Sequence, residues 1–169
     1  MKFSTRARYG LRMMVEIARK PGADLVSLSS VAQDTKISKR YLDQLALALK
    51  TSSLVRSTRG IGGGYQLSRP AEEISIAQII EAAIGPINIV ECVLCPERCV
   101  KSDCCECRQL YTRINREIVN VLSNMSLAEL VRMNASVTEA ASGGAGCPVT
   151  GEFGESGLVV KQKQARRIE

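Results

Sequence analysis

ISKRYLDQLALALKTSSLVRSTRGIGGGYQLS, residues 37 to 68, joins a well-marked helix start to a glycine-rich hairpin. Ser38 is a residue type that caps helix N-termini, and Ile37 and Leu42 have the spacing of a hydrophobic staple around it. The predicted helix buries a stripe of four apolar residues, which are Leu42, Leu45, Ala46 and Leu49. After residue 53 the period of the pattern falls towards two on both sides of a run of glycines, which predicts a β-hairpin.

Three further helices are predicted before and after this stretch, each from apolar residues at spacings of three and four. The first is expected to end at Pro21-Gly22, the second to begin after Ser27, and the last to end at Gly85-Pro86. The residues predicted to face the core are Leu11, Met14, Val15 and Ala18 in the first helix, Leu28, Val31 and Ala32 in the second, and Ile76, Ile79, Ile80 and Ala83 in the last. Three short helices followed by a hairpin predict a winged helix-turn-helix, in which the helix after Ser38 enters the major groove of DNA.

A long amphipathic helix is predicted in the second half of the chain. Its apolar residues repeat at spacings of three and four, and they are Leu110, Ile114, Ile118, Val121, Leu122 and Met125. One small domain cannot cover this stripe, so we expect it to pack against a second copy in a homodimer. Ser126 and Glu129 have capping-box spacing and predict a short helix from Leu127 to Met133.

The predicted fold class is therefore mainly α with a small β-hairpin, that is, a winged helix-turn-helix plus a long dimerisation helix. We expect a DNA-binding domain over residues 1–86, a cysteine-rich cluster-binding loop over 87–109, and the dimerisation helix with a short packing helix over 110–133. The remainder, 134–169, is rich in Gly, Ser, Ala, Glu and Lys without periodicity, which predicts a mostly disordered tail.

The overall composition predicts a soluble globular protein with one core. Of the 169 residues, 45% are hydrophobic and 24% charged, and no apolar run approaches the ~20 residues of a membrane span. The N-terminal residues lack the apolar stretch of a secretory signal, so we expect a cytoplasmic protein without a membrane partner. Histidine is absent, which excludes sites that use imidazole as base, nucleophile or ligand, and the sequence predicts no enzyme.

Positive charge is concentrated in the first part of the chain. Residues 1 to 70 contain 13 Lys and Arg against 4 Asp and Glu, whereas the remainder contains 10 against 13. A basic head on a mildly acidic body is typical of a polyanion-binding module, because each cation placed on a phosphate releases condensed counterions. A basic surface that is merely solvated remains the alternative when charge is considered alone.

The side chains expected to contact DNA lie on the predicted third helix and at the hairpin tip. On the helix they are Ser38, Lys39, Arg40, Tyr41, Asp43 and Gln44. Glutamine can bind adenine, an acidic side chain can accept from cytosine, and Lys or Arg can hold phosphates or guanine. Arg59 and Gly60 lie at the tip, where glycine permits close approach to the DNA backbone or minor groove. For Arg40 and Tyr41, solvation or packing without a DNA contact is the alternative.

Six cysteines lie within sixteen residues before the long helix, and they are Cys92, Cys95, Cys99, Cys104, Cys105 and Cys107. A cytosolic chain is not expected to use them as a disulfide framework, and thiolates that close repel one another unless a metal lies between them. The pattern therefore favours a metal centre over free thiols, and spacing alone leaves zinc and an iron-sulfur cluster as alternatives. Cys147 stands alone in the tail and is predicted not to be a ligand.

Three stretches resemble the family of the iron-sulfur cluster regulator IscR, which also includes nitric-oxide, iron and cysteine-metabolism regulators. They are RYG at residues 8–10, ISKRYLDQL at 37–45 and VRSTRGIGGGY at 55–65, within a resemblance that covers roughly residues 1 to 133. It implies a homodimer that binds a palindromic DNA operator, with Tyr41, Asp43 and Arg59 among its DNA contacts. The most similar relatives carry glutamate at the position of Asp43, so we expect base readout to differ there.

The same resemblance implies an iron-sulfur cluster of the 2Fe-2S type. When Tyr111 is matched to the aromatic residue that ends the family's pattern, its three cysteine ligands fall on Cys92, Cys99 and Cys105. The family's histidine ligand then falls on Arg108, which cannot bind a metal. The fourth ligand is accordingly open, with Cys107 and Cys104 as the first candidates and Glu106 as the next, and in some relatives it comes from the first helix. Cys95 is extra to the pattern.

The resulting hypothesis is a transcription regulator in which the cluster alters how two DNA-binding heads are spaced, and so selects among operators. Repression of iron-sulfur cluster biogenesis genes is the function that the resemblance implies. The alternatives are a cofactor-free or zinc-binding regulator of the same family, for example one of cysteine metabolism, and a redox or metal-carrier protein. The last of these would leave the basic head unexplained.

Overall fold

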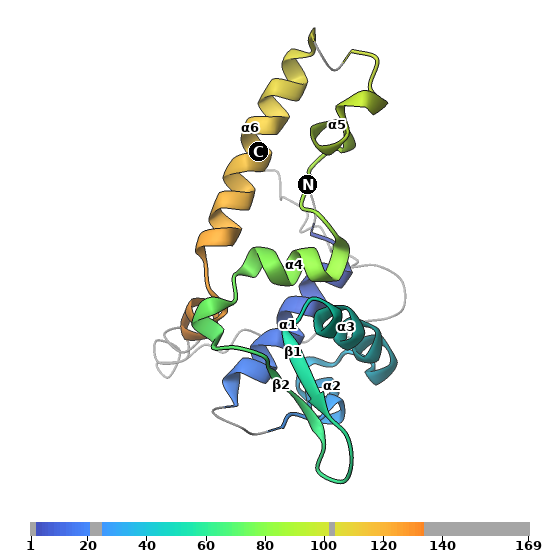
Figure 1. The fold of residues 1–169 in the computed structure, drawn as a ribbon, viewed down its shortest axis with the longest axis vertical. Coiled ribbons are helices and arrows are strands. Elements are labelled where there is room, and N and C mark those ends of the chain that lie inside the picture. Colours follow the sequence, from blue (N-terminus) through green and yellow to red (C-terminus); the bar gives the residue numbers. More distant parts are fainter. Residues whose placement is uncertain (1–2, 21–24, 102–103, 134–169) are drawn as a thin grey trace, which may run out of the picture.

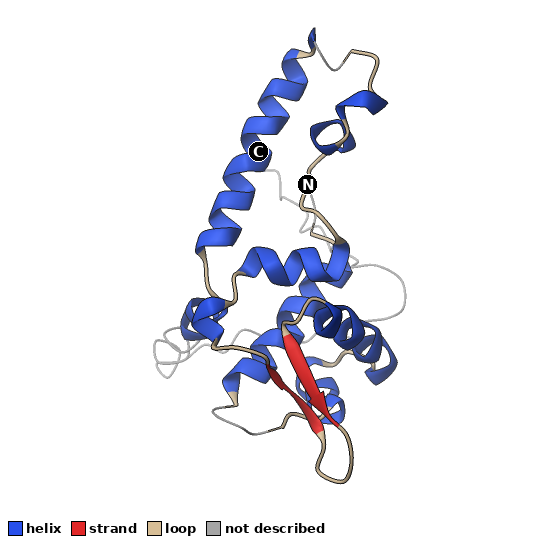
Figure 2. Ribbon diagram, viewed as in Figure 1, coloured by secondary structure: helices blue, strands red, loops and turns tan. Residues whose placement is uncertain are grey.

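The computed structural model describes residues 3–20, 25–101 and 104–133. Its elements are, in order, α1 (Thr5–Arg19), α2 (Leu28–Thr35), α3 (Lys39–Thr51), β1 (Val55–Thr58), β2 (Gly64–Leu67), the 3₁₀ helix η1 (Ala71–Glu73), α4 (Ile76–Ile84), α5 (Glu91–Leu94), the 3₁₀ helix η2 (Pro96–Arg98) and α6 (Glu106–Asn124). Residues 127–133 form one more helix. The described residues are mainly helical with a two-stranded antiparallel hairpin, which confirms the predicted fold class (Figures 1 and 2). The predicted tail and the predicted stop at Pro21-Gly22 lie outside the described residues.

Five of the described helices begin directly after a serine, and these serines are Ser4, Ser27, Ser38, Ser75 and Ser126. The Ser27 hydroxyl accepts from the N–H of Ser30 at 3.1 Å, as an N-cap does. Ser75 and Gln78 form a complete capping box at the start of α4. Ser38 occupies the predicted N-cap position, but its side chain makes no capping hydrogen bond. Its hydroxyl therefore stays available at the exposed start of α3.

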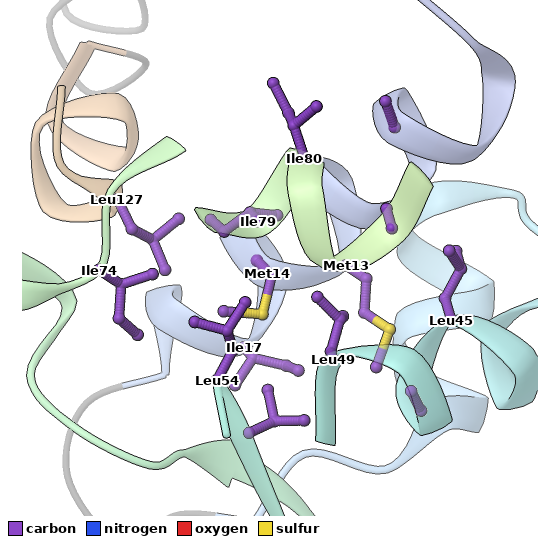
Figure 3. Packing of buried hydrophobic residues seen from close by; sticks show 14 of the residues in the cluster. Met13, Met14, Ile17, Leu45, Leu49, Leu54, Ile74, Ile79, Ile80 and Leu127 are labelled. Carbon is purple, nitrogen blue, oxygen red and sulfur yellow. The ribbon is translucent and has the colours of Figure 1, made fainter. Parts of the chain in front are cut away.

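We call the unit formed by α1 to α4 the head. Its core lies where α1, α3 and α4 meet (Figure 3). The largest side chains that are fully buried there include Met13, Met14, Leu45, Leu49, Leu54, Ile74, Ile79, Ile80 and Leu127. The predicted inward residues of α3 and α4 are all buried, and in α2 only Ala32 is half-buried instead. One predicted stripe needs correction, and it is that of α1.

The buried face of α1 lies further round the helix than its apolar residues predict. Met14 is buried as expected, whereas Leu11, Val15 and Ala18 are only half-buried. The buried residues are instead Ala7, Gly10, Met13, Met14 and Ile17. A Cβ added at Gly10 would lie 3.3 Å from the Cβ of Ala83, so glycine lets α1 and α4 approach closely along this line. Close approach at a residue without a side chain decides which face is covered.

The hairpin of β1 and β2, which we call the wing, is held to the head by a short backbone bridge. β1 and β2 pair antiparallel with Val55 opposite Leu67, and β2 is also paired on its other side with Val26. The N–H of Val26 donates to the oxygen of Tyr65 and the N–H of Tyr65 to the oxygen of Val26, both at 2.8 Å. The wing therefore extends from the head in a fixed direction, with its tip at the far end of the molecule from α5 (Figure 1).

The last described helix returns to the head after α6. The N–H of Ile76 donates to the oxygen of Met125 at 2.9 Å, and the N–H of Leu127 donates to the oxygen of Ile74 at 2.8 Å. Leu127 is fully buried in the head core. The C-terminal end of α6 is thereby tied to the head, and the helix extends away from the head towards its N-terminal end (Figure 1). None of the helices in the described part of the chain combines the length and apolar character that crossing a membrane requires.

Candidate nucleic-acid interface and cysteine segment

A groove of about 580 Å³ lies between α3 and the wing, and we call it the α3–wing groove. Residues from the start of α2, from one side of α3 and from the hairpin line it. Its charged lining residues are Lys39, Asp43, Lys50 and Arg59, so three cations face one anion. A concave surface with net positive charge, formed by a helix and a glycine-rich tip, suits a nucleic-acid backbone.

The structure places four of the eight predicted DNA contacts together in this groove. They are Lys39, Asp43, Arg59 and Gly60, all of which are exposed. Ser38, Arg40 and Gln44 are also exposed on α3 but lie outside the groove. The exposed surface of α3 thus carries polar side chains over a wider arc than the groove alone.

Tyr41 packs against α1 within the head. Its ring meets the ring of Tyr9 edge-on, with centroids 5.6 Å apart and planes at 88°. It is half-buried and lies against the hydrophobic core. The guanidinium of Arg12 lies 6.0 Å from the centre of the Tyr9 ring. The surroundings of Tyr41 therefore agree with a packing role, which is the alternative to a DNA contact.

The tip of the wing depends on glycine for its backbone shape. Gly60 has φ +111° and Gly62 has φ +78°, a region that side chains rarely permit. The N–H of Gly63 donates to the oxygen of Gly60 at 3.0 Å and closes the turn. Arg59 and Ile61 are exposed on this tip. Arg59 is therefore presented to solvent by a backbone that only glycines at these positions adopt without strain.

Several groove residues are absent from the set predicted from sequence, among them Leu47, Lys50 and Ser57. Lys50 Nζ donates to the Ser57 hydroxyl at 2.9 Å, which joins the end of α3 to β1. Leu47 is 68% exposed although it is a large apolar residue. Helical spacing from Lys39 and Asp43 could have indicated Leu47 and Lys50, since residues three and four apart share a face. Ser57 carried no comparable signal because its partner is on another element.

We call residues 91–107 the cysteine segment, and α5 at its start contacts α6. Cys92 is in α5, and Cys95 is the C-cap of that helix. Cys99 is the C-cap of η2, and Cys105 is the N-cap of α6. Cys104 and Cys107 are exposed, whereas Cys92, Cys95, Cys99 and Cys105 are half-buried. All six are free thiols. Cys147 lies outside the described residues.

Within residues 3–20, 25–101 and 104–133, no three Cys, Asp or Glu side chains are arranged as a metal-binding group. The structure therefore does not bring Cys92, Cys99, Cys105 and Cys107 together as a finished site. The donor type still fits an iron-sulfur cluster or zinc, since both are held by thiolates. Arg108, at the family's histidine position, instead donates from Nε to the oxygen of Cys92 at 2.9 Å.

The outer face of α6 is apolar and uncovered in the single chain. Leu110 is 56% exposed and Val121 61% exposed, and Ile114 is exposed between them. Together with Phe3 they line a groove of about 620 Å³. The head covers part of the predicted stripe, since Ile118, Leu122 and Met125 are half-buried against its core, and it leaves the other three residues open.

Comparisons with known proteins agree with this arrangement. The family model Rrf2, an iron-dependent transcriptional regulator, matches residues 3–133. The transcriptional regulator CymR of Bacillus subtilis is 39% identical over 140 residues, which are 83% of this chain and 96% of CymR. The structure of CymR, the global cysteine regulator of B. subtilis, has a TM-score of 0.66 at 37% identity and covers 79% of this chain and 98% of that one. The structure of T. potens IscR has a TM-score of 0.67 at 28% identity and covers 81% and 90%.

Proposed function

Since the chain belongs to the Rrf2 family and is a DNA-binding transcription regulator, we propose that it binds palindromic operators as a homodimer and senses an iron-sulfur cluster of the 2Fe-2S type. In this proposal it acts in the cytoplasm as a repressor of iron-sulfur cluster biogenesis genes. The observation that supports DNA binding best is the α3–wing groove, where Lys39, Lys50 and Arg59 surround a surface shaped by α3 and the wing. The major groove receives α3 and the phosphates or minor groove receive the wing.

The apolar face of α6 supports the homodimer. An exposed apolar groove of this kind on a soluble protein marks an interaction surface. A second copy of α6 is the occupant that we propose, because two-fold symmetry would also present two heads to a palindromic operator. Leu110, Ile114 and Val121 would then lie in the interface.

The six thiols support the metal centre by their chemistry. Cys92, Cys99 and Cys105 would hold the cluster, with Cys107 as the fourth ligand and Cys104 as the alternative. When bound, the cluster would supply fixed positive charge between thiolates and bring the cysteine segment into one arrangement. Because that segment continues directly into α6, its arrangement can bias the spacing of the two heads.

The test is to purify the full chain without oxygen and to measure iron, sulfide and zinc contents and the visible absorption. Binding to palindromic duplexes, selected by the protein from a random-sequence library, is then compared before and after chelation. We expect iron-containing, coloured protein whose DNA preference changes on chelation. Replacing Cys92, Cys99 and Cys105 together by alanine should abolish both, whereas Cys147→Ala should change neither. Iron-free protein with unchanged DNA affinity would contradict cluster sensing and leave DNA binding intact.

A second candidate is a cofactor-free or zinc-binding regulator of cysteine metabolism. It is favoured by the similarity to CymR, described as the global cysteine regulator of B. subtilis. Two features of this chain agree with it, namely Arg108 at the family's histidine position and the lack of a finished thiol site among the described residues. The metal analysis above separates the two candidates, because this one expects zinc or no metal.

A further inference from the structure

Asn115 is an unusual residue for the middle of a mostly exposed helix. It is 8% exposed and is the one buried polar or charged residue of the described chain. Its Nδ2 donates to the oxygen of Ile87 at 3.2 Å, and its Oδ1 accepts from the N–H of Ile89 at 3.1 Å. Both hydrogen bonds go to the backbone of the connector, residues 87–90, which joins α4 to the cysteine segment. A buried amide that satisfies two backbone groups is costly to replace.

Arg108 makes a parallel contact at the other end of the same stretch. It donates from Nε to the oxygen of Cys92 at 2.9 Å. Positions 108 and 115 are seven residues apart, so they lie on one face of α6 two turns from each other. The chain from Ile87 to Cys92 is therefore held to α6 at two points.

Burial of apolar side chains does not hold α5 and η2 in place. No residue of α5 or η2, both fully described, is buried. The ion pair between Arg98 and Glu91 has an N–O distance of 3.5 Å and is exposed, so it contributes little. Ile87, in contrast, belongs to the core cluster of the head. The hydrogen bonds of Asn115 and Arg108 thus join the head core, the first cysteine and α6.

We propose that Asn115 and Arg108 are positioning residues that hold residues 87–92 on the N-terminal half of α6. These two segments then undergo local opening together, as one cooperative unit. The consequence for regulation rests on the proposed function. The state of the cysteines reaches the dimerisation helix because the chain between them and the head is fixed to that helix. Without the two contacts, a rearrangement at the cysteines would change the conformation of the connector and would not reach α6.

Native-state amide hydrogen exchange on the full-length, reduced, metal-free protein tests the positioning role directly. We expect Asn115→Leu to accelerate exchange over residues 87–92 by roughly tenfold or more, because the Ile89 N–H loses its acceptor. Asn120→Leu is the matched control, since Asn120 is exposed on the same helix, and it should leave these rates unchanged. Arg108→Met keeps the aliphatic stem and should accelerate exchange around Cys92 even if Asn115→Leu folds poorly. Unchanged rates in both variants would overturn the proposal.

A second measurement separates this inference from the proposed function. The ratio of DNA affinities is measured between protein reconstituted anaerobically with ferrous iron and sulfide and protein without metal. We expect Asn115→Leu to move that ratio towards one while its iron content stays that of the parent. A variant that retains the parent ratio would overturn the role in transmission. A parent ratio of one would contradict cluster sensing itself, and the exchange rates would still decide the positioning role.

Discussion

Arg59 is an exposed guanidinium on a tip whose backbone is shaped by Gly60 and Gly62. Its charge is the feature of the wing most directly available to a phosphate or a narrow minor groove. We expect Arg59→Ala to weaken DNA binding roughly tenfold and to lower the salt slope by about 1, measured by fluorescence anisotropy. Arg98→Ala is the control, because Arg98 is an exposed arginine in η2, outside the α3–wing groove. Equal affinities for the two variants would remove the wing from the interface.

Gly64 is required by packing between backbones. A Cβ at this position would lie 2.7 Å from the oxygen of Val26 and 2.8 Å from its carbonyl carbon. We therefore expect Gly64→Ala to break the Val26 to Tyr65 bridge and to lower the free energy of unfolding by about 1–3 kcal/mol. Urea unfolding at fixed protein concentration measures this, with Gln66→Ala in the same strand as the control. A Gly64→Ala protein as stable as the parent would show that the bridge does not hold the wing.

At the scale of single elements, the helix of residues 127–133 depends on its capping box. The N–H of Ser126 donates to Glu129 Oε2 at 2.7 Å, and the N–H of Glu129 donates to the Ser126 hydroxyl at 3.1 Å. The hydrogen bonds from the Ser126 backbone and hydroxyl hold the pKa of Glu129 below its ordinary value of 4.5.

A carboxyl group whose pKa is lowered by folding stabilises the folded state above its ordinary pKa, and this contribution is lost as pH falls through the folded value. We expect Glu129→Gln to flatten the dependence of stability on pH below about 4.5, because glutamine keeps the acceptor without the charge. Thermal unfolding from pH 7 to pH 3 measures the difference. Parallel pH profiles for the parent and Glu129→Gln would contradict the assignment.

The α6 helix carries three large apolar side chains that the described part of its own chain leaves exposed, and they are Leu110, Ile114 and Val121. Val121 is 61% exposed, and a carboxylate there would have to be buried in the proposed dimer. We expect Val121→Glu to raise the dimer dissociation constant at least about 100-fold, which corresponds to about 2.8 kcal/mol, in sedimentation equilibrium. Asn120→Glu, an exposed neighbour on the same helix, adds the same charge as a control. A Val121→Glu protein that stays dimeric would place the interface elsewhere.

At the scale of the whole molecule, the head is basic and the remainder is mildly acidic, so DNA is expected to bind at the head. The α3–wing groove of each protomer presents Lys39, Lys50 and Arg59. If each cation neutralises one phosphate, a dimer makes about six such contacts, and affinity should fall about 1,000-fold between 50 and 200 mM salt. Titrations at several salt concentrations measure the slope. A slope near zero would mean that these cations do not meet phosphates.

Much of the fold could be predicted because its signals are local. The serine before α2, the helix start at Ser38 and the glycines of the wing act through neighbours in the chain, and each lies where the pattern predicted. The candidate DNA contacts were predicted in part, since charge on an exposed helix face is also a local property. Lys50 with Ser57 was missed, because a contact between elements leaves no period in the sequence.

The sequence by itself determined the longer helices, the hairpin, the basic head and the thiol donors, because each follows from residue type and spacing along the chain, whereas α5 and the two 3₁₀ helices were not predicted. Only the tertiary structure decided which face of α1 is buried, that residues 127–133 close the head core through Leu127, and that Asn115 holds the connector. These features depend on which surfaces meet, as where Gly10 lets α1 approach Ala83. Apolar spacing says that a face can be buried, but the partner that covers it comes from a distant part of the chain, and only the fold brings that partner into contact.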